Sequence, residues 1–250
     1  MLEQRCDLLR SLHIPGTPLV LPNAWDAASA RAVVAAGFPV VATTSGGVAA
    51  TLGYQDHEGA PAEEMLAAAA RIAASVDVPV TVDAEAGYGM SPADLVDSLL
   101  QVGAAGCNLE DTDHGSGRLV EASRHAERLA AVRVAATDRE YGLVINARVD
   151  VFLAAGGERS QHHLLDDAVA RAHAYLAAGA DCVFPILLHE AEVIAAFVGA
   201  VEAPVNILTL PRAPTNSRLA ELGVARISHG SSLHHRSMDE VTATLADLAR

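Results

Sequence analysis

The sequence predicts an α/β protein whose residues 1–250 form a single (β/α)8 barrel domain. Three observations predict it. The chain has 250 residues, about the length that one such barrel needs. Eight strand-like segments alternate with helix-like segments, without a long linker or a low-complexity stretch. An Ala-rich helical run, a glycine and a short β-branched strand recur in the same order at 35–43, 103–110, 177–185 and 221–228. An open doubly wound sheet is the alternative, but it does not normally carry eight equally spaced units.

The eight strands are predicted from short apolar runs that suit burial on both faces of a parallel sheet. Four follow a glycine that suits the C-cap of the preceding helix, and others follow a proline or glycine directly. In chain order the strand-containing segments are 18–24, 35–43, 78–83, 103–110, 142–147, 177–185, 203–208 and 221–228.

The helices are predicted from the longer Ala- and Leu-rich segments between the strands. Ser91 and Pro92 supply an N-cap and a proline at the first helical position, and Thr215 or Asn216 supplies another N-cap. The predicted helices cover 25–36, 61–75, 91–102, 121–138, 162–178, 189–199, 215–222 and 238–249, with a short extra helix at 2–12.

The composition excludes several classes of function. The net charge of −14 disfavours binding to nucleic acid or to an anionic membrane surface. All 17 basic residues are arginine, which removes mechanisms that need a Schiff-base or acid–base lysine. Hydrophobic residues make up 51% of the chain and aromatic residues only 4%, so the core must be aliphatic.

The cysteines and the N-terminal segment predict a cytoplasmic protein. Cys6, Cys107 and Cys182 lie far apart and form no CxxC pair, so neither a zinc site nor a disulfide framework is indicated, and buried free thiols are expected. The first twelve residues are too charged for a signal peptide, and no apolar stretch reaches membrane-spanning length.

Four acidic residues follow two consecutive predicted strands. Asp83 and Glu85 lie at and just after the end of the strand at 78–83, and Glu110 and Asp111 lie at and just after the end of the segment at 103–110. The carboxyl ends of parallel strands share one edge of the sheet, and carboxylates crowded there repel one another unless they share protons or a cation. Two residues apart in a strand face the same way, so Asp83 and Glu85 are expected to address one ion, whereas Asp111 points away from Glu110. Asp83, Glu85 and Glu110 are therefore predicted to hold a hard divalent cation.

The other strand ends supply candidates for substrate binding and proton transfer. Ser45, Gly46 and Gly47 are expected to form a loop whose backbone N–H groups face an anion. Arg148 is expected to bind a carboxylate or a developing oxyanion, or else to form a structural pair with Asp150. Asp56 and His114 are further candidates for catalysis, and Asn206 and His229 are further candidates for substrate binding. The adjacent histidines 162–163 and 234–235 are predicted to be surface residues, because neighbours in a helix diverge.

The residues taken together resemble the isocitrate lyase/phosphoenolpyruvate mutase superfamily. The segments that carry the resemblance, in chain order, are LPNAWDAASARAVVAAGFPVVATTSGGVAATLGYQD, VTVDAEAGYG, GCNLED, INARVD, GADCVFP, APVNIL and GVARIS. The resemblance covers nearly the whole chain. It implies a (β/α)8 barrel assembled as a homo-oligomer, a dimer or typically a tetramer, in which neighbouring subunits often exchange the last helix.

The resemblance also implies the cofactor and the site. It implies Mg²⁺, with Mn²⁺ as the alternative, and a small 2-oxo or 2-hydroxy carboxylate as the substrate. Asp83 resembles the direct metal ligand, and Glu85 and Glu110 the acids that hold the ion mainly through water. Ser45, Gly46 and Gly47 resemble the loop that takes the substrate carboxylate and keto oxygen. Arg148 resembles the arginine at the reacting end, and Asp56 the acid ahead of the second helix.

The loop after the fourth strand departs from the best-known members. Isocitrate and methylisocitrate lyases carry Lys-Lys-Cys-Gly-His there, with a catalytic cysteine, and phosphonomutases carry a lysine and an asparagine. Residues 111–118 instead read DTDHGSGR, without Cys, Lys or Asn. The chain is therefore similar to the short-loop members of the superfamily, which include decarboxylases.

Three functions stay open at this point. The first is an Mg²⁺-dependent lyase or decarboxylase that cleaves a C–C bond next to the 2-oxo or 2-hydroxy acid unit through a metal-stabilised enolate. In it, Arg148 balances charge on the departing group, and a water, Asp56 or His114 moves the proton. The second is a P–C bond hydrolase or mutase of the phosphonopyruvate type. The third is a barrel that binds a 2-oxo acid without turnover.

Overall fold

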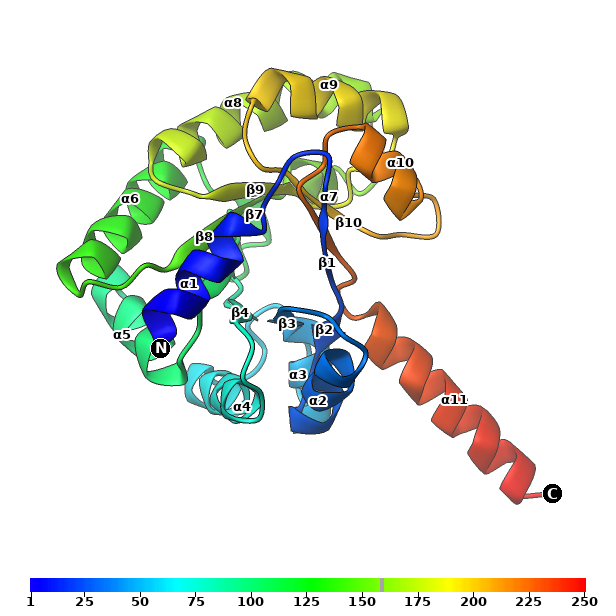
Figure 1. Ribbon diagram of the computed structural model, residues 1–250. Helices are drawn as coiled ribbons and strands as arrows, with labels where there is room; N and C mark the ends of the chain where they lie inside the picture. Colours follow the sequence, from blue (N-terminus) through cyan, green and yellow to red (C-terminus); the bar gives the residue numbers. More distant parts are fainter. Residues whose placement is uncertain (158–159) are drawn as a thin grey trace.

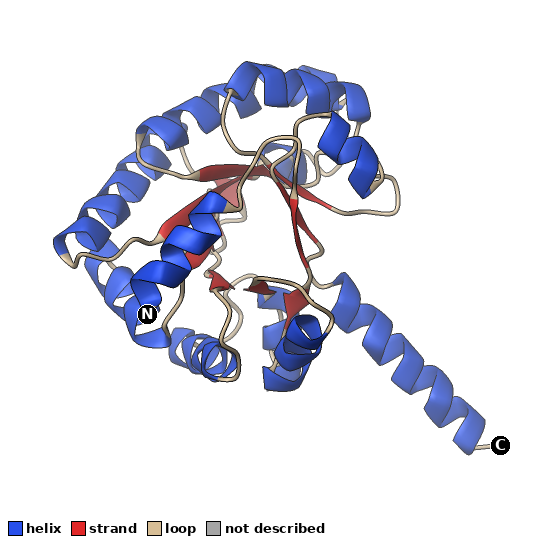
Figure 2. Ribbon diagram, viewed as in Figure 1, coloured by secondary structure: helices blue, strands red, loops and turns tan. Residues whose placement is uncertain are grey.

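The computed structural model describes residues 1–157 and 160–250, and it shows a closed ring of parallel strands surrounded by helices (Figures 1 and 2). One run of neighbouring strands is β2–β3–β4–β5–β8–β9, and the other is β1–β11–β10. A parallel bridge between Val183 and Val205 joins β9 to β10. β1 and β2 are two halves of one predicted strand, interrupted at Pro22, whose nitrogen has no hydrogen to donate. The predicted barrel is confirmed.

All eight predicted strands are present. Their bounds are β1 Leu19–Leu21 with β2 Asn23–Ala24, β3 Val41–Thr43, β4 Val80–Asp83, β5 Gly106–Leu109, β8 Val144–Val149, β9 Cys182–Pro185, β10 Asn206–Leu208 and β11 Arg226–Ser228. Their registers place the predicted acidic residues along one rim: Asp83 pairs with Asn108, and Leu109, just before Glu110, pairs with Ala147, just before Arg148.

The predicted helices are confirmed to within a few residues, apart from the last. They are α1 Leu2–Ser11, α2 Ala27–Ala35, α4 Ala62–Ala74, α5 Pro92–Val102, α6 Ala122–Asp138, α8 Leu165–Ala177, α9 Ala191–Val201, α10 Asn216–Glu221 and α11 Ser232–Leu248. The side chains of Ser91 and Thr215 accept hydrogen bonds from the third residue of their helices, as the cap prediction requires.

Four short elements were not predicted. They are the helix α3 Ser45–Leu52, the two strands of an antiparallel hairpin, β6 Thr112–Asp113 and β7 Arg118–Leu119, and the helical turn α7 Val151–Ala154. The helix predicted at 162–178 begins as the 3₁₀ helix η1 Gln161–Leu164, which leads directly into α8. The glycine loop predicted at Ser45–Gly47 is wrong, because these residues form the first turn of α3. Glycine is needed there for close packing: a Cβ on Gly46 would lie 2.7 Å from Asp56 Oδ2, and one on Gly47 would lie 2.7 Å from Thr44 Cγ2.

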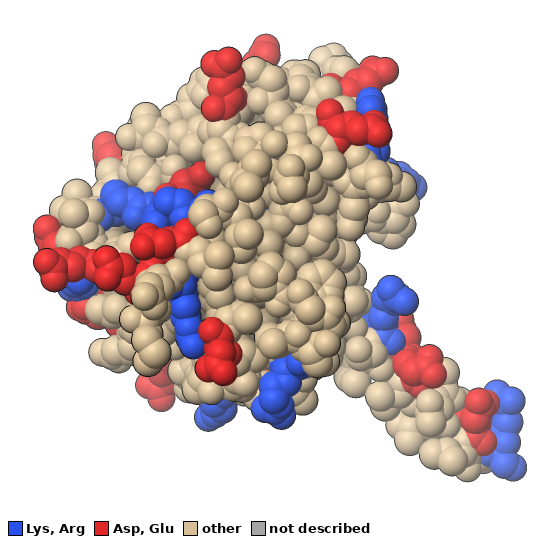
Figure 3. Space-filling model, viewed as in Figure 1, with Lys and Arg blue, Asp and Glu red and all other residues tan. Residues whose placement is uncertain are grey.

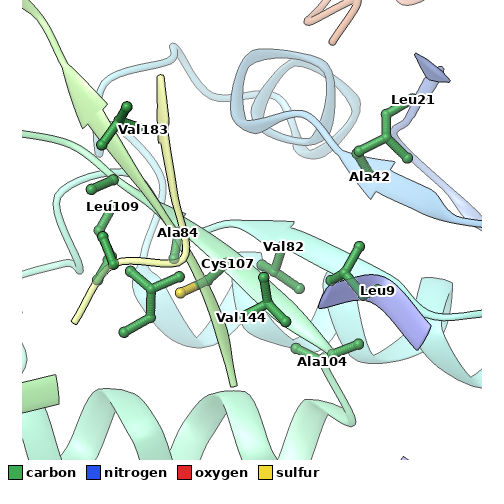
Figure 4. Close-up of a cluster of buried hydrophobic side chains, with 14 of the residues drawn as sticks. Leu9, Leu21, Ala42, Val82, Ala84, Ala104, Cys107, Leu109, Val144 and Val183 are labelled. Carbon is green, nitrogen blue, oxygen red and sulfur yellow. The ribbon is translucent and has the colours of Figure 1, made fainter. Parts of the chain in front are cut away.

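The core is aliphatic, as the composition predicts. Figure 4 shows Val82, Cys107 and Val144 from neighbouring strands packed together, with Leu9 of α1 closing the amino-terminal end of the barrel. All three cysteines are free and buried, also as expected. On the face that Figure 3 shows, arginine and acidic side chains are interspersed. In the described residues no helix has both the length and the apolar character needed to cross a membrane.

The last helix extends away from the barrel (Figure 1). α11 starts at Ser232, six residues before the predicted start, and every residue from 238 to its end is exposed. A groove of about 1320 Å³ runs between α2 and the first half of α11. The predicted surface position of His234 is wrong, because its ring is buried against Trp25 with ring centroids 5.2 Å apart. His162 and His163 are exposed as predicted.

Candidate active site at the mouth of the barrel

Three carboxylates gather at the carboxyl ends of β4 and β5. Asp83 is the last residue of β4, Glu85 lies in the turn that follows, and Glu110 comes directly after β5. The backbone N–H of Glu110 donates to the carbonyl of Glu85 at 2.9 Å, and this hydrogen bond joins the segments that follow β4 and β5. The strand argument for Asp83 and Glu85 is wrong, because β4 stops at Asp83 and Glu85 adopts a left-handed φ of 48°. A turn, and not strand alternation, places Glu85 beside Asp83.

Asp83 is held by backbone and amide donors. Its Oδ2 accepts from the N–H of Ser45 at 3.2 Å, and its Oδ1 accepts from Asn108 Nδ2 at 3.3 Å. The amide of Asn108 has a defined orientation, because its Oδ1 accepts from Asn146 Nδ2 at 2.8 Å and from Arg226 Nη2 at 3.3 Å. Arg226 is only 1% exposed, so a buried positive charge lies near Asp83, and the side-chain amide of Asn108 connects the two.

Glu85 is covered by the loop that follows α3. The backbone N–H of Glu58 donates to Glu85 Oε2, and the carboxylate of Glu58 accepts from the N–H of Tyr88 at 2.6 Å. Glu85 is only 2% exposed. Burial raises its pKa to about 8, and the charges of Asp83, Asp56 and Glu110 add to this rise against the Glu58 hydrogen bond. Asp56, in the same loop, has one buried carboxylate oxygen with no hydrogen-bond partner in the described part of the chain.

Arg148 and His114 contact the third carboxylate. Arg148 Nη1 pairs with Glu110 Oε1, and His114 Nε2 lies 3.0 Å from Glu110 Oε2. The His114 contact lacks the alignment of a hydrogen bond. Burial raises the pKa of Glu110, and the Arg148 guanidinium opposes that rise. Glu110 in turn raises the pKa of His114. The ring of His57 lies over His114, with centroids 5.3 Å apart.

The guanidinium of Arg148 also forms a two-bond fork with Asp150. Nε donates to Oδ1 at 2.7 Å and Nη2 donates to Oδ2 at 2.9 Å. The predicted structural pair therefore exists together with the contact to Glu110. Of the five guanidinium hydrogens, three are engaged by the described residues, so one on Nη1 and one on Nη2 have no partner among them.

The donor set fits a hard cation. Asp83, Glu85 and Glu110 offer only oxygen atoms, they repel one another, and Glu85 and Glu110 are nearly fully buried. Within the described ranges, no three His, Cys, Asp or Glu side chains come close enough to hold a metal ion by themselves. The side chains therefore suit one or two direct bonds with the remaining positions filled by water or substrate.

The other predicted site residues are dispersed. Ser45 reaches the cluster through its backbone. Gly46 packs against Asp56 and Ser231, and Gly47 packs against Trp25 and His234, away from the carboxylates. Asn206 is fully buried and exchanges hydrogen bonds with Ser228. His229 contacts Thr209 and lines the groove beside α11, so the structure places Gly47, Asn206 and His229 in other surroundings than the acidic cluster.

Sequence reasoning missed several residues that build the site. Asn108 and Asn146 precede Glu110 and Arg148 by two residues in their strands, so period-two alternation was the signal that could have found them. Glu58 carried no such signal, because its role depends on the left-handed backbone of His57 and Glu58. A cavity of about 390 Å³ adjoins the site between the hairpin and α6, and Glu110, His114, His125 and Arg128 are among the residues that line it.

Comparison with known proteins identifies a family, similar sequences and a similar crystal structure. The family model described as phosphoenolpyruvate phosphomutase matches residues 9–249. An uncharacterized protein of Mycobacterium tuberculosis is 37% identical over 220 residues, covering 88% of this chain and 80% of that protein. A probable 2-methylisocitrate lyase 2 of Corynebacterium glutamicum is 32% identical, covering 92% and 76% of the two chains. The crystal structure of a "putative phosphonomutase" from Burkholderia cenocepacia J2315 aligns with a TM-score of 0.94 and 42% identity over 99% of each chain.

Proposed function

The chain belongs to the phosphoenolpyruvate phosphomutase family, in the isocitrate lyase/phosphoenolpyruvate mutase superfamily, and on that premise we propose that it is an Mg²⁺-dependent carbon–carbon lyase. The substrate is a small 2-oxo or 2-hydroxy acid, cleaved next to that unit. The observation that carries the proposal is the convergence of Asp83, Glu85 and Glu110 with Arg148 at one end of the barrel. The likeness to the probable 2-methylisocitrate lyase supports cleavage of a C–C bond.

The three acids would hold the ion. Asp83 would bind it directly, because Asn108 and Ser45 hold its two oxygens in a fixed orientation. Glu85 and Glu110 would act mainly through water, and their unfavourable burial would be relieved by a positive charge. When bound, Mg²⁺ supplies a Lewis acid that polarises the acid unit of the substrate and lowers the energy of the negative charge formed on cleavage. Mn²⁺ fits the same oxygen donors.

Arg148 and His114 would act on the departing part of the substrate. The two free hydrogens of Arg148 are available to a carboxylate, while its fork with Asp150 keeps the guanidinium plane fixed. His114, on the hairpin, contacts Glu110, as Arg148 does, and its imidazole can carry a proton. Asp56 is the other candidate for moving the proton, because its Oδ1 is buried without a hydrogen-bond partner in the described residues, while its Oδ2 lies next to Gly46. The loop that contains Glu58 covers Glu85 and would keep bulk water from this side of the site.

A panel assay tests the proposal. The purified protein with Mg²⁺ is given 2-hydroxy and 2-oxo di- and tricarboxylates, and pyruvate, glyoxylate and CO₂ are measured. We expect one substrate to yield stoichiometric fragments, and we expect Arg148→Met to lose most of that turnover. Exposed Arg218→Met is the matched control, because among the described residues Arg218 forms an ion pair only with Glu221, on the surface of α10. Tight oxalate binding with no product from any substrate would instead indicate a barrel that binds without turnover.

A phosphonate reaction is the second candidate, because the aligned Burkholderia structure is described as a phosphonomutase. Phosphonopyruvate therefore belongs in the same panel. Release of inorganic phosphate, or formation of phosphoenolpyruvate, would favour cleavage or transfer at a P–C bond over the lyase. The hairpin, residues 112–119, lacks the lysine and asparagine of the phosphonomutases, which is why the lyase stands first.

The protein is also proposed to form a homo-oligomer, a dimer or tetramer, through α11. Met238, Val241, Leu245 and Leu248 form an exposed apolar ridge on this helix, between 47% and 78% exposed, and they do not line the groove beside α2. Burying such a ridge against a second copy removes apolar area from water. Light scattering after gel filtration tests this: Val241→Asp with Leu245→Asp should lower the oligomeric state, whereas Ala246→Asp, off the ridge, should not. An oligomer unchanged by the double variant would refute this role of α11.

A further inference from the structure

Asp111 follows the metal-site candidate Glu110 but serves a different set of partners. It is fully buried and points to the opposite side of the strand end. Its Oδ1 accepts from the backbone N–H of Asp150 at 2.8 Å. Its Oδ2 accepts from Tyr175 Oη at 2.6 Å and from Arg171 Nη1 at 3.0 Å. Three hydrogen bonds therefore hold this carboxylate, and one of them fixes the backbone of Asp150, the residue that holds Arg148.

Arg171 fastens the hairpin at both of its ends. Its Nη1 donates to Asp111, which precedes β6, and to the carbonyl of Val120 at 2.8 Å, which follows β7. Val120 also donates its N–H to the carbonyl of Asp111 at 2.8 Å. Arg171 and Tyr175 lie one turn apart on α8, so the two ends of the hairpin are bound to one rigid helix.

Two side chains of the hairpin contact the candidate active site. Thr112 Oγ1 donates to Asp150 Oδ2 at 2.6 Å, the same oxygen that accepts from Arg148. His114, two residues further along, contacts Glu110. Asp150 is thus held at its backbone by Asp111 and at its side chain by Thr112.

We propose that Asp111, Arg171 and Tyr175 are positioning residues that fix the orientation of the Arg148–Asp150 pair and of the hairpin that carries His114. This inference rests on the proposed function, because it assigns to Arg148 and His114 the work on the substrate. In the described part of the chain, the side chains of these three residues make no hydrogen bond to Asp83, Glu85 or Glu110; they act through Asp150 and the hairpin. A small displacement of a positioned group lowers turnover by up to about a hundredfold.

Energetics favour a positioning role over a purely stabilising one. A buried ion pair such as Asp111–Arg171 is often no more stabilising than apolar side chains of the same volume, because both charges lose their hydration. The ion pair instead fixes orientation, because hydrogen bonds to carboxylate oxygens have preferred directions. Here these hydrogen bonds come from Asp150, Tyr175 and Arg171. Removal of one partner should therefore loosen the hairpin and the Arg148 fork together.

The opposite end of the barrel offers a matched control. Arg133 on α6 makes a similar anchor with Asp181, at 2.6 Å, and with the carbonyls of Gly179 and Leu143. This anchor lies at the amino-terminal ends of β8 and β9, and within the described residues the Arg133 side chain donates no hydrogen bond to a candidate site residue. Arg133→Met should lower the melting temperature and leave kcat of the folded protein unchanged.

The test combines hydrogen exchange with steady-state kinetics on the intact protein. We expect Tyr175→Phe to lower kcat about tenfold and Arg171→Met about a hundredfold, with KM changed less than about threefold. Both should speed amide exchange within residues 112–120. Arg171→Lys should recover part of kcat, because an ammonium can reach the place of Nη1. Tyr175→Phe keeps the test available where Arg171→Met fails to fold, because it removes only one oxygen.

Two results would overturn the proposal. One is unchanged exchange in residues 112–120 for both variants, which would show that the hairpin does not depend on this anchor. The other is faster exchange with kcat equal to that of Arg133→Met, which would show an anchor without influence on the reacting groups. Failure of the proposed function is separate, because it shows as absence of product from the wild-type protein. The exchange experiment then decides on the anchor alone.

Discussion

Replacement of Glu85 by glutamine should stabilise the metal-free protein. Glu85 has a pKa near 8 in the folded chain because it is buried near three other carboxylates, against 4.5 in its ordinary state. A raised pKa in an acid means that the folded state binds the proton more tightly than the unfolded state. The stability contributed by Glu85 is therefore full below pH 4.5 and is lost as the pH rises toward 8.

The size of the effect follows from the two pKa values. At about pH 7.5, linkage gives roughly 4 kcal/mol of destabilisation from this one carboxyl, and at pH 4.5 less than about 0.5 kcal/mol. Glutamine keeps an oxygen that can accept from the Glu58 N–H and cannot ionise. Glu85→Gln should then raise the free energy of unfolding by up to about 3 kcal/mol at pH 7.5 in chelator, and by little at pH 4.5.

Urea denaturation with EDTA or with Mg²⁺ measures both consequences. Mg²⁺ at about a hundred times its Kd should stabilise the wild-type protein by roughly 2.7 kcal/mol, and Glu85→Gln by clearly less. Glu63→Gln is the matched control, since the same chemical change then falls on an exposed residue of α4. A Glu85→Gln protein that is no more stable than this control at pH 7.5 would refute the crowded-carboxylate argument.

Three further predictions concern the metal, the packing and the response to acid. Asp83→Ala should lower turnover by on the order of 10²–10³ and remove its dependence on Mg²⁺, and full turnover of this variant in chelator would contradict the metal site. Gly46→Ala should raise KM, because its Cβ would lie 2.7 Å from Asp56 Oδ2, while Gly199→Ala, with open space around it, should leave KM unchanged; equal KM values would contradict the packing argument. Burial lowers the pKa of His125 from 6.5 to about 4. The folded state therefore binds that proton less tightly, stability falls as the pH drops from 6.5 to 4, and His125→Gln should lose roughly 2 kcal/mol less than wild type on going from pH 7.5 to pH 5 in urea titrations.

The sequence sufficed for the order and nearly the full set of barrel elements. Strands buried on both faces and Ala-rich helices leave local signatures, and so do caps such as Ser91 and Thr215, because each depends on residues within one turn. The rule that parallel strands end on one rim was enough to predict that Asp83, Glu110 and Arg148 lie at the same end of the barrel, and the strand registers agree.

The sequence did not suffice where a residue's role depends on a partner far along the chain. Glu85 reaches the site through a left-handed turn, and Ser45 through its backbone N–H at the start of α3. Asp56, in the loop that follows α3, and Ser231, distant in sequence, leave no room for a side chain at Gly46. The hairpin was missed because its two strands are only two residues long, and Arg171 and Tyr175 gave no sign of serving a carboxylate some sixty positions earlier.

The amino-acid sequence by itself determined the closed α/β architecture and the acidic rim, because periodicity and the ends of strands depend on residues that are neighbours in the sequence. Only the tertiary structure decided how the acids are oriented, which buried groups hold Arg148, and that α11 leaves its own barrel. These features arise from burial and from hydrogen bonds between segments distant in sequence, and these interactions form only in the folded chain.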